Sequence, residues 1–512
     1  MNTTKNKQLS IEIIDTTLRD GEQTSGVSFA VNEKLSIARL LLEEVQVDRI
    51  EIASARVSKG EQDAVTRIIN WSKGRGYLSK IEVLGFVDGT ITVDWMKQTG
   101  AKVLNLLCKG SLKHVTEQLY RTPEQHVKEI TEVIRYAEIN NIQVNVYLED
   151  WSNGIQQSPD YVYFMMDHLL PLPIQRFMLP DTLGILNPYQ TGLFCKDMIE
   201  RYPTAHFDFH AHNDYDFAVA NSFAAAMVGI HGIHATVNGL GERAGNPPLS
   251  SIMAVLTDHL HVRLNTKEDR ISHVSKIVES YSGIRIPTNK PIIGENVFTQ
   301  CAGIHADGDN KNNLYYNDLL PERFGRERSY ALGKTSGKAN IRKNLESLGI
   351  ELDDASMKLL TQHIIELGDK KELVSMEDLP YIISDLLHSE EIEEKIHVLN
   401  YSLSVAQGLK PVATIKIDIK GTIYQRTAVG NGQYDAFMKA LWQIYDSLKK
   451  PHPILADYEV TIPPGGSTDA FVQTSITWKF NDRTFKTKAL DPDQTEAAIK
   501  ATIKMLNLIE PI

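Results

Sequence analysis

Cysteine is scarce in this sequence. The 512 residues include three cysteines, Cys108, Cys195 and Cys301, which lie far apart and form no Cys-x-x-Cys pair. This spacing argues against a disulfide framework and against a zinc site built from cysteine. An excess of positive charge is also lacking, because the formal net charge is −11. Nucleic acid and anionic membranes are therefore not expected as partners.

Long apolar segments are absent as well. No uninterrupted apolar run is long enough to span a bilayer, and residues 1–10 are polar, without the apolar core of a signal peptide. Hydrophobic residues make up 42% of the chain and charged residues 23%, as is usual for a globular protein. We therefore expect a cytoplasmic enzyme with more than one domain and an ample core.

What is present is an alternation of short β-like runs with helical patterns. An apolar stripe of helical spacing between residues 35 and 45, for example, separates the first two runs. The expected strands are Ile11–Asp15, Val47–Ser54, Ile81–Val87, Val103–Cys108, Val144–Glu149, Arg176–Pro180, His206–His210 and Gly232–Val237. Eight strands alternating with helices predict an α/β fold, a parallel (β/α)8 TIM barrel. A doubly wound open sheet is the alternative, but the Gly-rich turn that it predicts after the first strand is absent.

Polar and charged residues recur at the ends of these runs. They are Asp20, Glu149, Asp150, Asp181, Thr182, His210, His212 and Asn246. An isolated Arg19-Asp20 pair would be read as an ion pair at a strand end. The recurrence instead favours a shared site, because the active site of such a barrel lies at the carboxyl ends of its strands.

The types of these residues suggest a metal site next to a guanidinium group. Asp is a hard oxygen ligand, and Arg19 offers a planar fork of donors that could polarise a ketone oxygen. His210 and His212 are two residues apart, so both imidazoles would face one side of a strand. Together with oxygen ligands they suit Mn²⁺, Mg²⁺ or Zn²⁺. Two half-buried structural histidines are the alternative interpretation.

Three motifs resemble one enzyme family. The run Asp15–Gln23, D-T-T-L-R-D-G-E-Q, resembles the opening strand of the enzymes that join acetyl-CoA to a 2-oxo acid, namely the isopropylmalate, homocitrate and citramalate synthases. The run His210–Asp214, H-A-H-N-D, and the run Gly239–Asn246, G-L-G-E-R-A-G-N, match further motifs of this family. The resemblance extends over essentially the whole chain.

The resemblance implies a metal-dependent Claisen condensation. It assigns Asp20, His210 and His212 as ligands of a divalent metal, with Asn246 as a weaker fourth. Arg19, Glu149 and His305 become the catalytic candidates, with the division of proton transfer between the last two left open. Arg19, Asp20, Glu149 and Thr182 become contacts of the 2-oxo acid.

The choice of substrate depends on three further positions. Leu84, Leu107 and Tyr147 resemble the members of the family that use pyruvate, in which matching residues form a bulky apolar wall against its methyl group. Isopropylmalate synthases tend to read H-x-F-x-A-T-S near the fourth strand, and this chain keeps only Ser111 of that run. Pyruvate is therefore expected, with formation of citramalate. The alternatives are an isopropylmalate or homocitrate synthase, a lyase and a catalytically silent binding protein.

The expected domains are a catalytic barrel over residues 1–286, helical linker subdomains over 287–394 and a C-terminal α+β regulatory domain over 395–512. The run Gly303–Gly308 resembles the family segment that reaches over a barrel from a partner subunit of a homodimer. The residues expected to contact acetyl-CoA are Phe86, Asp307, Asn313, Leu314 and Tyr315.

The last domain is predicted to repeat a unit of strands followed by one helix, which indicates an internal pseudo-twofold. It resembles the regulatory domain that binds an end-product amino acid. Because citramalate leads towards isoleucine, isoleucine is the expected feedback inhibitor, whereas leucine would fit an isopropylmalate synthase. The expected effector contacts are Tyr434, Asp435, Leu455, Tyr458, Thr468, Val472 and Gln494. An ordinary apolar core is the alternative reading of these residues.

Overall fold

The computed structural model describes residues 10–309, 311, 314–348, 350–369, 374, 376–387, 396–461, 472–481 and 483–509. The chain forms two compact units. The first unit comprises Met1–Phe298 and Asn317–Glu327, and the second comprises Thr299–Tyr316 and Arg328–Ile512. Within the described ranges, no helix is both long and apolar enough to cross a membrane.

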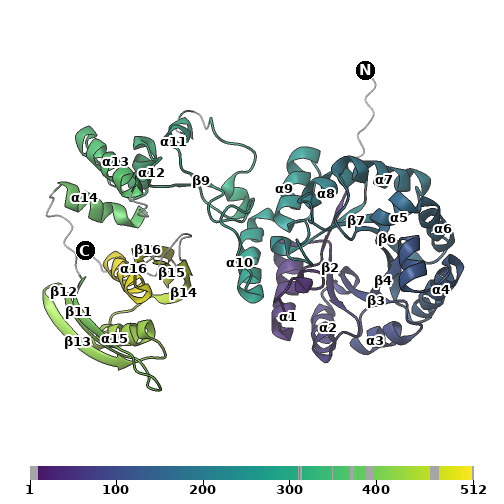
Figure 1. The fold of residues 1–512 in the computed structure, drawn as a ribbon, viewed down its shortest axis with the longest axis horizontal. Coiled ribbons are helices and arrows are strands. Elements are labelled where there is room, and N and C mark those ends of the chain that lie inside the picture. Colours follow the sequence, from purple (N-terminus) through teal and green to yellow (C-terminus); the bar gives the residue numbers. More distant parts are fainter. Residues whose placement is uncertain are drawn as a thin grey trace. The chain divides into compact units, whose positions relative to one another are not determined.

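The first unit is built on a closed barrel of eight parallel strands, as the sequence predicts (Figure 1). Its strands are β1 (Glu12–Asp15), β2 (Arg49–Ser54), β3 (Ile81–Phe86), β4 (Val103–Lys109), β5 (Gln143–Glu149), β6 (Ile174–Asp181), β7 (Phe207–Ala211) and β8 (Gly232–Ala235). Pairing of Glu12 with Gly232 and of Asp15 with Ala235 joins β1 to β8 and closes the barrel. The open-sheet alternative is thereby excluded.

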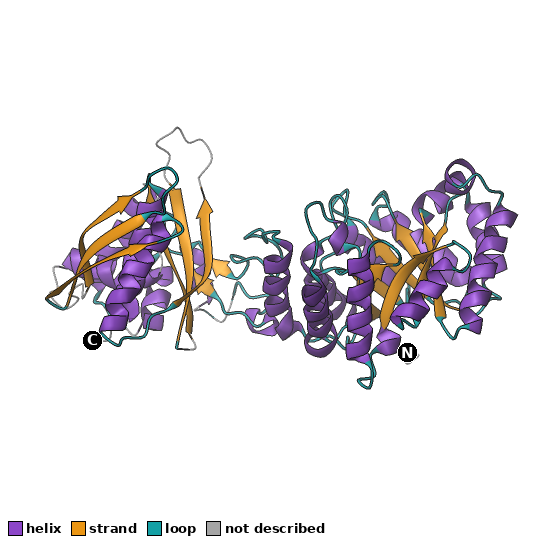
Figure 2. Ribbon diagram, turned by 90° about the horizontal axis from the view of Figure 1, so that it is seen from below, coloured by secondary structure: helices purple, strands orange, loops and turns teal. Residues whose placement is uncertain are grey.

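Helices surround the strands of the barrel (Figure 2). They are α1 (Val31–Arg39), α2 (Lys59–Ser72), α3 (Ile91–Thr99), α4 (Pro123–Ile139), α5 (Trp151–Gln157), α6 (Pro159–Leu169), α7 (Pro188–Arg201), α8 (Ala218–Met227), α9 (Leu249–Leu260) and α10 (Ile271–Ser282). Local sequence sets where α4 begins. The Thr122 hydroxyl accepts from the Gln125 amide, and the Gln125 side chain accepts from the Thr122 amide, a reciprocal cap before Pro123.

The interior of the barrel is polar, which the sequence analysis did not predict. Arg49 is 3% exposed and donates to Glu82 at 2.8 Å and to Asp208 at 2.6 Å. Asn105 donates to Glu82 at 2.9 Å and to Glu51 at 2.7 Å. Buried charges are tolerated when they are paired and hydrogen-bonded. These contacts therefore form one connected polar network across β2, β3, β4 and β7.

The second unit begins with a helical region. It contains β9 (Thr299–Gln300) and β10 (Ser329–Tyr330), which pair in parallel, and the helices α11 (Gly303–Asp309), α12 (Lys338–Leu348), α13 (Asp354–Asp369) and α14 (Leu379–Leu387). The apolar core of α12 to α14 includes Ile341, Leu345, Leu360 and Leu379.

The remainder of the second unit repeats three antiparallel strands followed by one helix, which confirms the predicted repeat. The first repeat is β11 (Ile396–Ser404), β12 (Val412–Ile419), β13 (Thr422–Val429) and α15 (Gln433–Ser447). The second is β14 (Ile454–Thr461), β15 (Val472–Phe480), β16 (Arg483–Asp491) and α16 (Gln494–Ile509). Alternate residues of β12, including Ile415 and Ile417, are buried in one core with Leu441 of α15 and Met505 of α16.

Lys34 of α1 ties the loop after β1 to the surrounding helices. Its side chain is 1% exposed, and its Nζ lies 2.6 Å from a carboxylate oxygen of both Glu22 and Glu61. The same Nζ donates to the backbone oxygens of Leu18 and Ile52. Because Leu18 immediately precedes Arg19 and Asp20, Lys34 helps to fix the backbone that carries these two residues.

We expect Lys34→Met to lower the free energy of unfolding by about 3 kcal/mol or more, because it leaves two carboxylates without their shared cation. Lys97→Met is the control. Lys97 forms a surface pair with Asp94, and such pairs contribute about 0–1 kcal/mol. Urea unfolding followed by circular dichroism measures both values. Equal destabilisation by the two substitutions would contradict the role given to Lys34.

Candidate active site

Asp20, His210 and His212 come together at the carboxyl end of the barrel. Their ligand atoms all lie within 4.8 Å of one another, and all three residues are buried. His210 Nε2 lies 3.0 Å from Asp20 Oδ2, and His212 Nε2 lies 3.8 Å from the same oxygen. The turn after β1 therefore supplies the carboxylate, and the end of β7 supplies both imidazoles on one side of the chain.

The donor set of this cluster fits a divalent metal ion. Both carboxylate oxygens of Asp20 are buried and accept no hydrogen bond from a backbone amide or a hydroxyl group of the described residues, so their polar neighbours are the two imidazoles and the Arg19 guanidinium. A buried carboxylate needs positive charge beside it, and a metal ion shared with the two imidazoles would add to the charge that Arg19 supplies. One carboxylate and two imidazoles suit Mn²⁺, Zn²⁺, Mg²⁺ or a similar divalent ion.

Asn246, the expected fourth ligand, lies beside the cluster with its amide nitrogen turned towards it. Its Nδ2 lies 3.4 Å from His210 Nε2 and donates to the Ala211 carbonyl at 2.9 Å. Its Oδ1 lies against Gly241, where an added Cβ would approach within 1.9 Å. Coordination through Oδ1 would therefore require the amide to turn over and to give up its bond to Ala211.

The electrostatic surroundings keep these groups in the protonation states that bind metal. Burial raises the pKa of the Asp20 carboxyl, but Arg19 and the two histidines outweigh this effect and hold that pKa well below its usual range. Burial lowers the pKa of His212 to about 4 and lowers the pKa of His210 as well. Near neutral pH the cluster is thus one carboxylate with two neutral imidazoles.

Arg19 lies next to this cluster, and its guanidinium group is fixed by polar residues of the barrel interior. Its Nε lies 2.5 Å from Glu51, its Nη1 lies 3.6 Å from Asp20, and its Nη2 lies 3.4 Å from the hydroxyl of Tyr147. Arg19 therefore forms the ion pair with Asp20 and also belongs to the site shared with the histidines, so the two interpretations of the Arg19-Asp20 pair are compatible. Glu51 was missed by the sequence analysis. The available signal was a carboxylate inside the apolar run I-E-I of a predicted strand.

Leu84, Leu107 and Tyr147 lie together, as the substrate hypothesis requires, and Met178 joins them. Leu84, Tyr147 and Met178 form a buried apolar cluster against which Leu107 packs. Tyr147 pairs in register with Leu107 on one side and with Met178 on the other. Met178 was missed, although alignment of the predicted strands would have placed it beside Tyr147. The cluster is not wholly apolar, because the Tyr147 hydroxyl faces Arg19.

The other barrel residues of interest also lie at strand ends. Glu149 ends β5 and forms an ion pair with Lys109 of β4. Thr182 follows β6, and its hydroxyl oxygen accepts the Asp150 amide at 2.9 Å. Phe86 ends β3 and pairs in register with Leu107. Asp181 instead accepts the amides of the loop after β6 at residues 185 and 186, which indicates a structural role.

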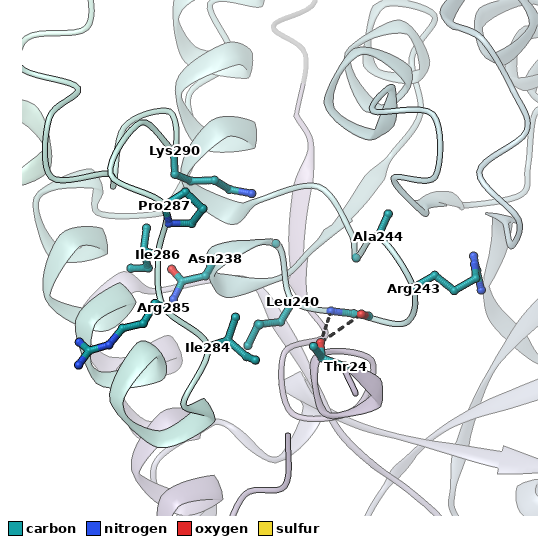
Figure 3. Close-up of a pocket in the computed structure, with 13 residues that line it drawn as sticks. Thr24, Asn238, Leu240, Arg243, Ala244, Ile284, Arg285, Ile286, Pro287 and Lys290 are labelled. Carbon is teal, nitrogen blue, oxygen red and sulfur yellow. Dashed lines mark hydrogen bonds between the residues drawn. The ribbon is translucent and has the colours of Figure 1, made fainter. Parts of the chain in front are cut away.

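A pocket of about 230 Å³ lies beside the glycine-rich loop Gly239–Asn246 (Figure 3). Thr24 lines it, and its hydroxyl accepts from the Gly241 amide and donates to the Gly241 carbonyl. The spacing of glycines in this loop follows from close backbone approach. A Cβ on Gly245, whose φ is +87°, would lie 2.0 Å from the Gly239 carbonyl oxygen. Larger residues at position 245 would therefore displace the loop that carries Asn246.

The remaining catalytic candidate, His305, and most of the expected acetyl-CoA contacts belong to the second unit. His305 lies on α11, and its ring centroid is 4.3 Å from that of Tyr315. Asp307 pairs with Lys311 at 2.6 Å, while Leu314 is 69% exposed. Asn313 lies outside the described residues. These residues therefore form a local group on and after α11.

A second pocket, of about 440 Å³, lies at the starts of α15 and α16. It is lined by Gly432, Gln433, Tyr434, Asp435, Leu455, Tyr458, Gln494 and Thr495. Most of the expected effector contacts thus lie around one cavity. Val472 is instead buried at the start of β15, and Thr468 lies outside the described residues.

The comparisons with protein families cover nearly the whole chain. Residues 10–278 match the family described as HMGL-like. Residues 292–372 match the homocitrate synthase post-HMGL domain-like family. Residues 373–510 match the LeuA allosteric (dimerisation) domain.

Individual relatives match over similar lengths. A Methanopyrus kandleri protein, provisionally named (R)-citramalate synthase CimA, is 35% identical over 91% of this chain and 89% of its own. (R)-Citramalate synthase CimA of Methanocaldococcus jannaschii is 29% identical over 98% of this chain and 100% of its own. The 2-isopropylmalate synthase of the same organism is 30% identical over 98% and 94%, respectively.

Asp15, the first residue of the D-T-T-L-R-D run, has a pKa that differs between the folded and unfolded states, so it makes the free energy of unfolding depend on pH. Burial raises its pKa to about 7, although its carboxylate accepts the Thr17 amide at 2.9 Å. A carboxyl whose pKa is higher in the folded state binds its proton more tightly there. The free energy of unfolding therefore decreases as the pH rises from about 4 to about 7.

We expect Asp15→Asn to remove this decrease, since the amide oxygen can still accept from Thr17 without ionising. The variant should gain stability relative to the unmodified protein as the pH is raised through this window. Urea unfolding at several pH values measures the difference. Asp160→Asn, at an exposed position on α6, is the control and should show no such trend. A pH-independent difference for Asp15→Asn would contradict the prediction.

Proposed function

Since this chain belongs to the isopropylmalate, homocitrate and citramalate synthase family, we propose that it is an (R)-citramalate synthase. The chain is an acyltransferase that condenses acetyl-CoA with a 2-oxo acid and converts the acyl group to an alkyl group. Relatives named for citramalate and for isopropylmalate match at similar identity, so the relatives do not choose between pyruvate and 2-oxoisovalerate. The choice of pyruvate depends on the site.

The observation that carries the choice is the wall of Leu84, Leu107, Tyr147 and Met178. These side chains meet beside Arg19, and three of them are buried. In this proposal the wall leaves room for the methyl group of pyruvate and sterically excludes the branched side chain of 2-oxoisovalerate. Each methylene that is accommodated or excluded contributes about 1–3 kcal/mol, so a preference of one to several orders of magnitude is attainable.

The residues around the wall have complementary roles in this proposal. A divalent ion held by Asp20, His210 and His212 would supply Lewis acidity to the keto oxygen. Arg19, fixed by Glu51, donates to the alkoxide that develops on that oxygen. The Thr182 oxygen already accepts the Asp150 amide, so its own hydrogen is the group that donates to the substrate carboxylate.

The bond changes also require proton transfer. A base removes a proton from the acetyl methyl group, the resulting enolate carbon bonds to the ketone carbon, and the new alkoxide takes up a proton. Water then cleaves the thioester and releases CoA. We assign the proton transfers to Glu149 and His305. Contacts with acetyl-CoA are assigned to Phe86, Asp307, Asn313, Leu314 and Tyr315.

We predict that pyruvate is preferred over 2-oxoisovalerate by at least about 10-fold in kcat/KM, with 2-oxobutyrate between them, because each added methyl group meets the wall. Leu107→Ala should narrow this preference by opening the wall. Release of free CoA with each 2-oxo acid measures it. Leu193→Ala is the control, because Leu193 is 51% exposed on α7. If the unmodified enzyme prefers 2-oxoisovalerate, the proposal fails and isopropylmalate synthase replaces it.

We further propose that the chain forms a homodimer and that isoleucine binds the 440 Å³ pocket at α15 and α16. The match to a family described as an allosteric and dimerisation domain supports this proposal. Asp435 places a carboxylate at the pocket for an amino group, and Leu455 and Tyr458 supply apolar surface. Inhibition requires that isoleucine bind two conformations unequally.

We predict that Asp435→Asn raises the isoleucine concentration for half-inhibition by about 10-fold, because a charge-assisted hydrogen bond contributes about 1.5–3 kcal/mol. Asp446→Asn is the control, since Asp446 lies on the same helix with a side chain 70% exposed. Activity against isoleucine concentration is measured for both variants. Unchanged inhibition of Asp435→Asn would place the effector elsewhere, and inhibition by leucine alone would favour an isopropylmalate synthase.

A further inference from the structure

His234 of β8 connects the candidate metal cluster to the charged interior of the barrel. It is 1% exposed and was not among the predicted site residues. Its Nδ1 lies 3.2 Å from His210 Nδ1, and its Nε2 lies 3.4 Å from Asp208 Oδ2. Asp208 in turn accepts from Arg49 at 2.6 Å. A continuous line of contacts therefore runs from Arg49 to His210.

The positions of the hydrogens along this line follow from the chemistry of imidazole. His210 Nε2 faces Asp20 at 3.0 Å, so Nε2 is the atom that would bind a metal ion and must then carry no hydrogen. A neutral His210 consequently carries its hydrogen on Nδ1. This Nδ1–H can donate to His234 only if His234 Nδ1 is bare, which leaves the His234 hydrogen on Nε2, facing the Asp208 carboxylate.

The opposite arrangement is unfavourable. If His234 carried its hydrogen on Nδ1, its bare Nε2 would face Asp208 Oδ2, which places two lone pairs against each other at 3.4 Å. Because Arg49 keeps Asp208 as a carboxylate, Asp208 selects the tautomer of His234 that accepts from His210. The Tyr147 hydroxyl lies 3.0 Å from the same His234 Nδ1. It can instead donate to Glu51, at 3.4 Å, which leaves His234 Nδ1 able to accept from His210.

We propose that His234 is a positioning residue for the metal ligand His210. It fixes the His210 ring and its tautomer so that Nε2 is bare and directed at Asp20. The two rings are nearly perpendicular, with centroids 5.2 Å apart, so a rotation of either ring would break the contact between the Nδ1 atoms. This inference rests on the proposed metal site and adds to it a residue that touches neither substrate nor metal.

The test compares metal affinity among substitutions of His234 in the full-length protein. The dissociation constant for Mn²⁺ is measured by calorimetry without substrates, because outer residues of this kind typically change metal affinity about 10–100-fold. His234→Ala should weaken Mn²⁺ binding by that factor. His234→Asn places an amide near the position of Nδ1 and should restore part of the affinity. His234→Gln places its amide near Nε2 and should not.

Controls separate this effect from general damage and from failure of the metal site itself. His259→Gln, at an exposed position on α9, should bind Mn²⁺ as the unmodified protein does, and thermal unfolding of every variant reports on the fold. His210→Ala should abolish binding. If His210→Ala binds normally, the metal site is wrong. If His210→Ala loses Mn²⁺ binding while His234→Asn and His234→Gln have the same Mn²⁺ affinity as each other, only the positioning role of His234 is overturned.

Discussion

The negative charge of Asp20 is the constraint on which the barrel mouth depends. A carboxylate that is 0% exposed has lost its hydration and must be compensated by groups nearby. Arg19, 3.6 Å away, supplies positive charge, His210 and His212 lie beside the carboxylate as its partners in the candidate metal cluster, and all three side chains are themselves largely buried, with hydrogen-bonding needs of their own. Arg19 is satisfied by Glu51, and His210 by His234. Each solution therefore introduces a further polar group inside the barrel.

This succession explains why the barrel interior is polar along its length. Glu51 accepts from Asn105, Asn105 also donates to Glu82, and Glu82 accepts from Arg49. Arg49 joins Asp208, which returns through His234 to His210. A barrel filled only with branched apolar residues would pack well but could not hold a buried carboxylate at its mouth. The polar network inside the barrel and the candidate metal cluster at its carboxyl end are therefore connected by direct polar contacts.

The sequence predicted the barrel because each strand is a short apolar run and each helix has its own stripe, so local patterns carry the topology. The sequence also predicted that Asp20, His210 and His212 lie in one site, because all three follow strands or end them. It missed Glu51, Met178 and His234 because their importance comes from cross-strand neighbours, which a linear reading does not reveal. The orientation of the Asn246 amide was likewise beyond reach, as it depends on the Ala211 carbonyl and on Gly241.

The contacts of Arg49 also bear on how this barrel can diverge. One guanidinium satisfies Glu12, Glu82 and Asp208, which come from three different strands. Glu12 is 35% exposed, whereas Glu82 and Asp208 are fully buried, so loss of Arg49 would leave two buried carboxylates without their shared cation. Exchange of Arg49 alone is therefore costly, whereas its exchange together with both buried carboxylates can be neutral. Among related sequences, Arg49, Glu82 and Asp208 should therefore change together or not at all, even where the surrounding apolar residues vary.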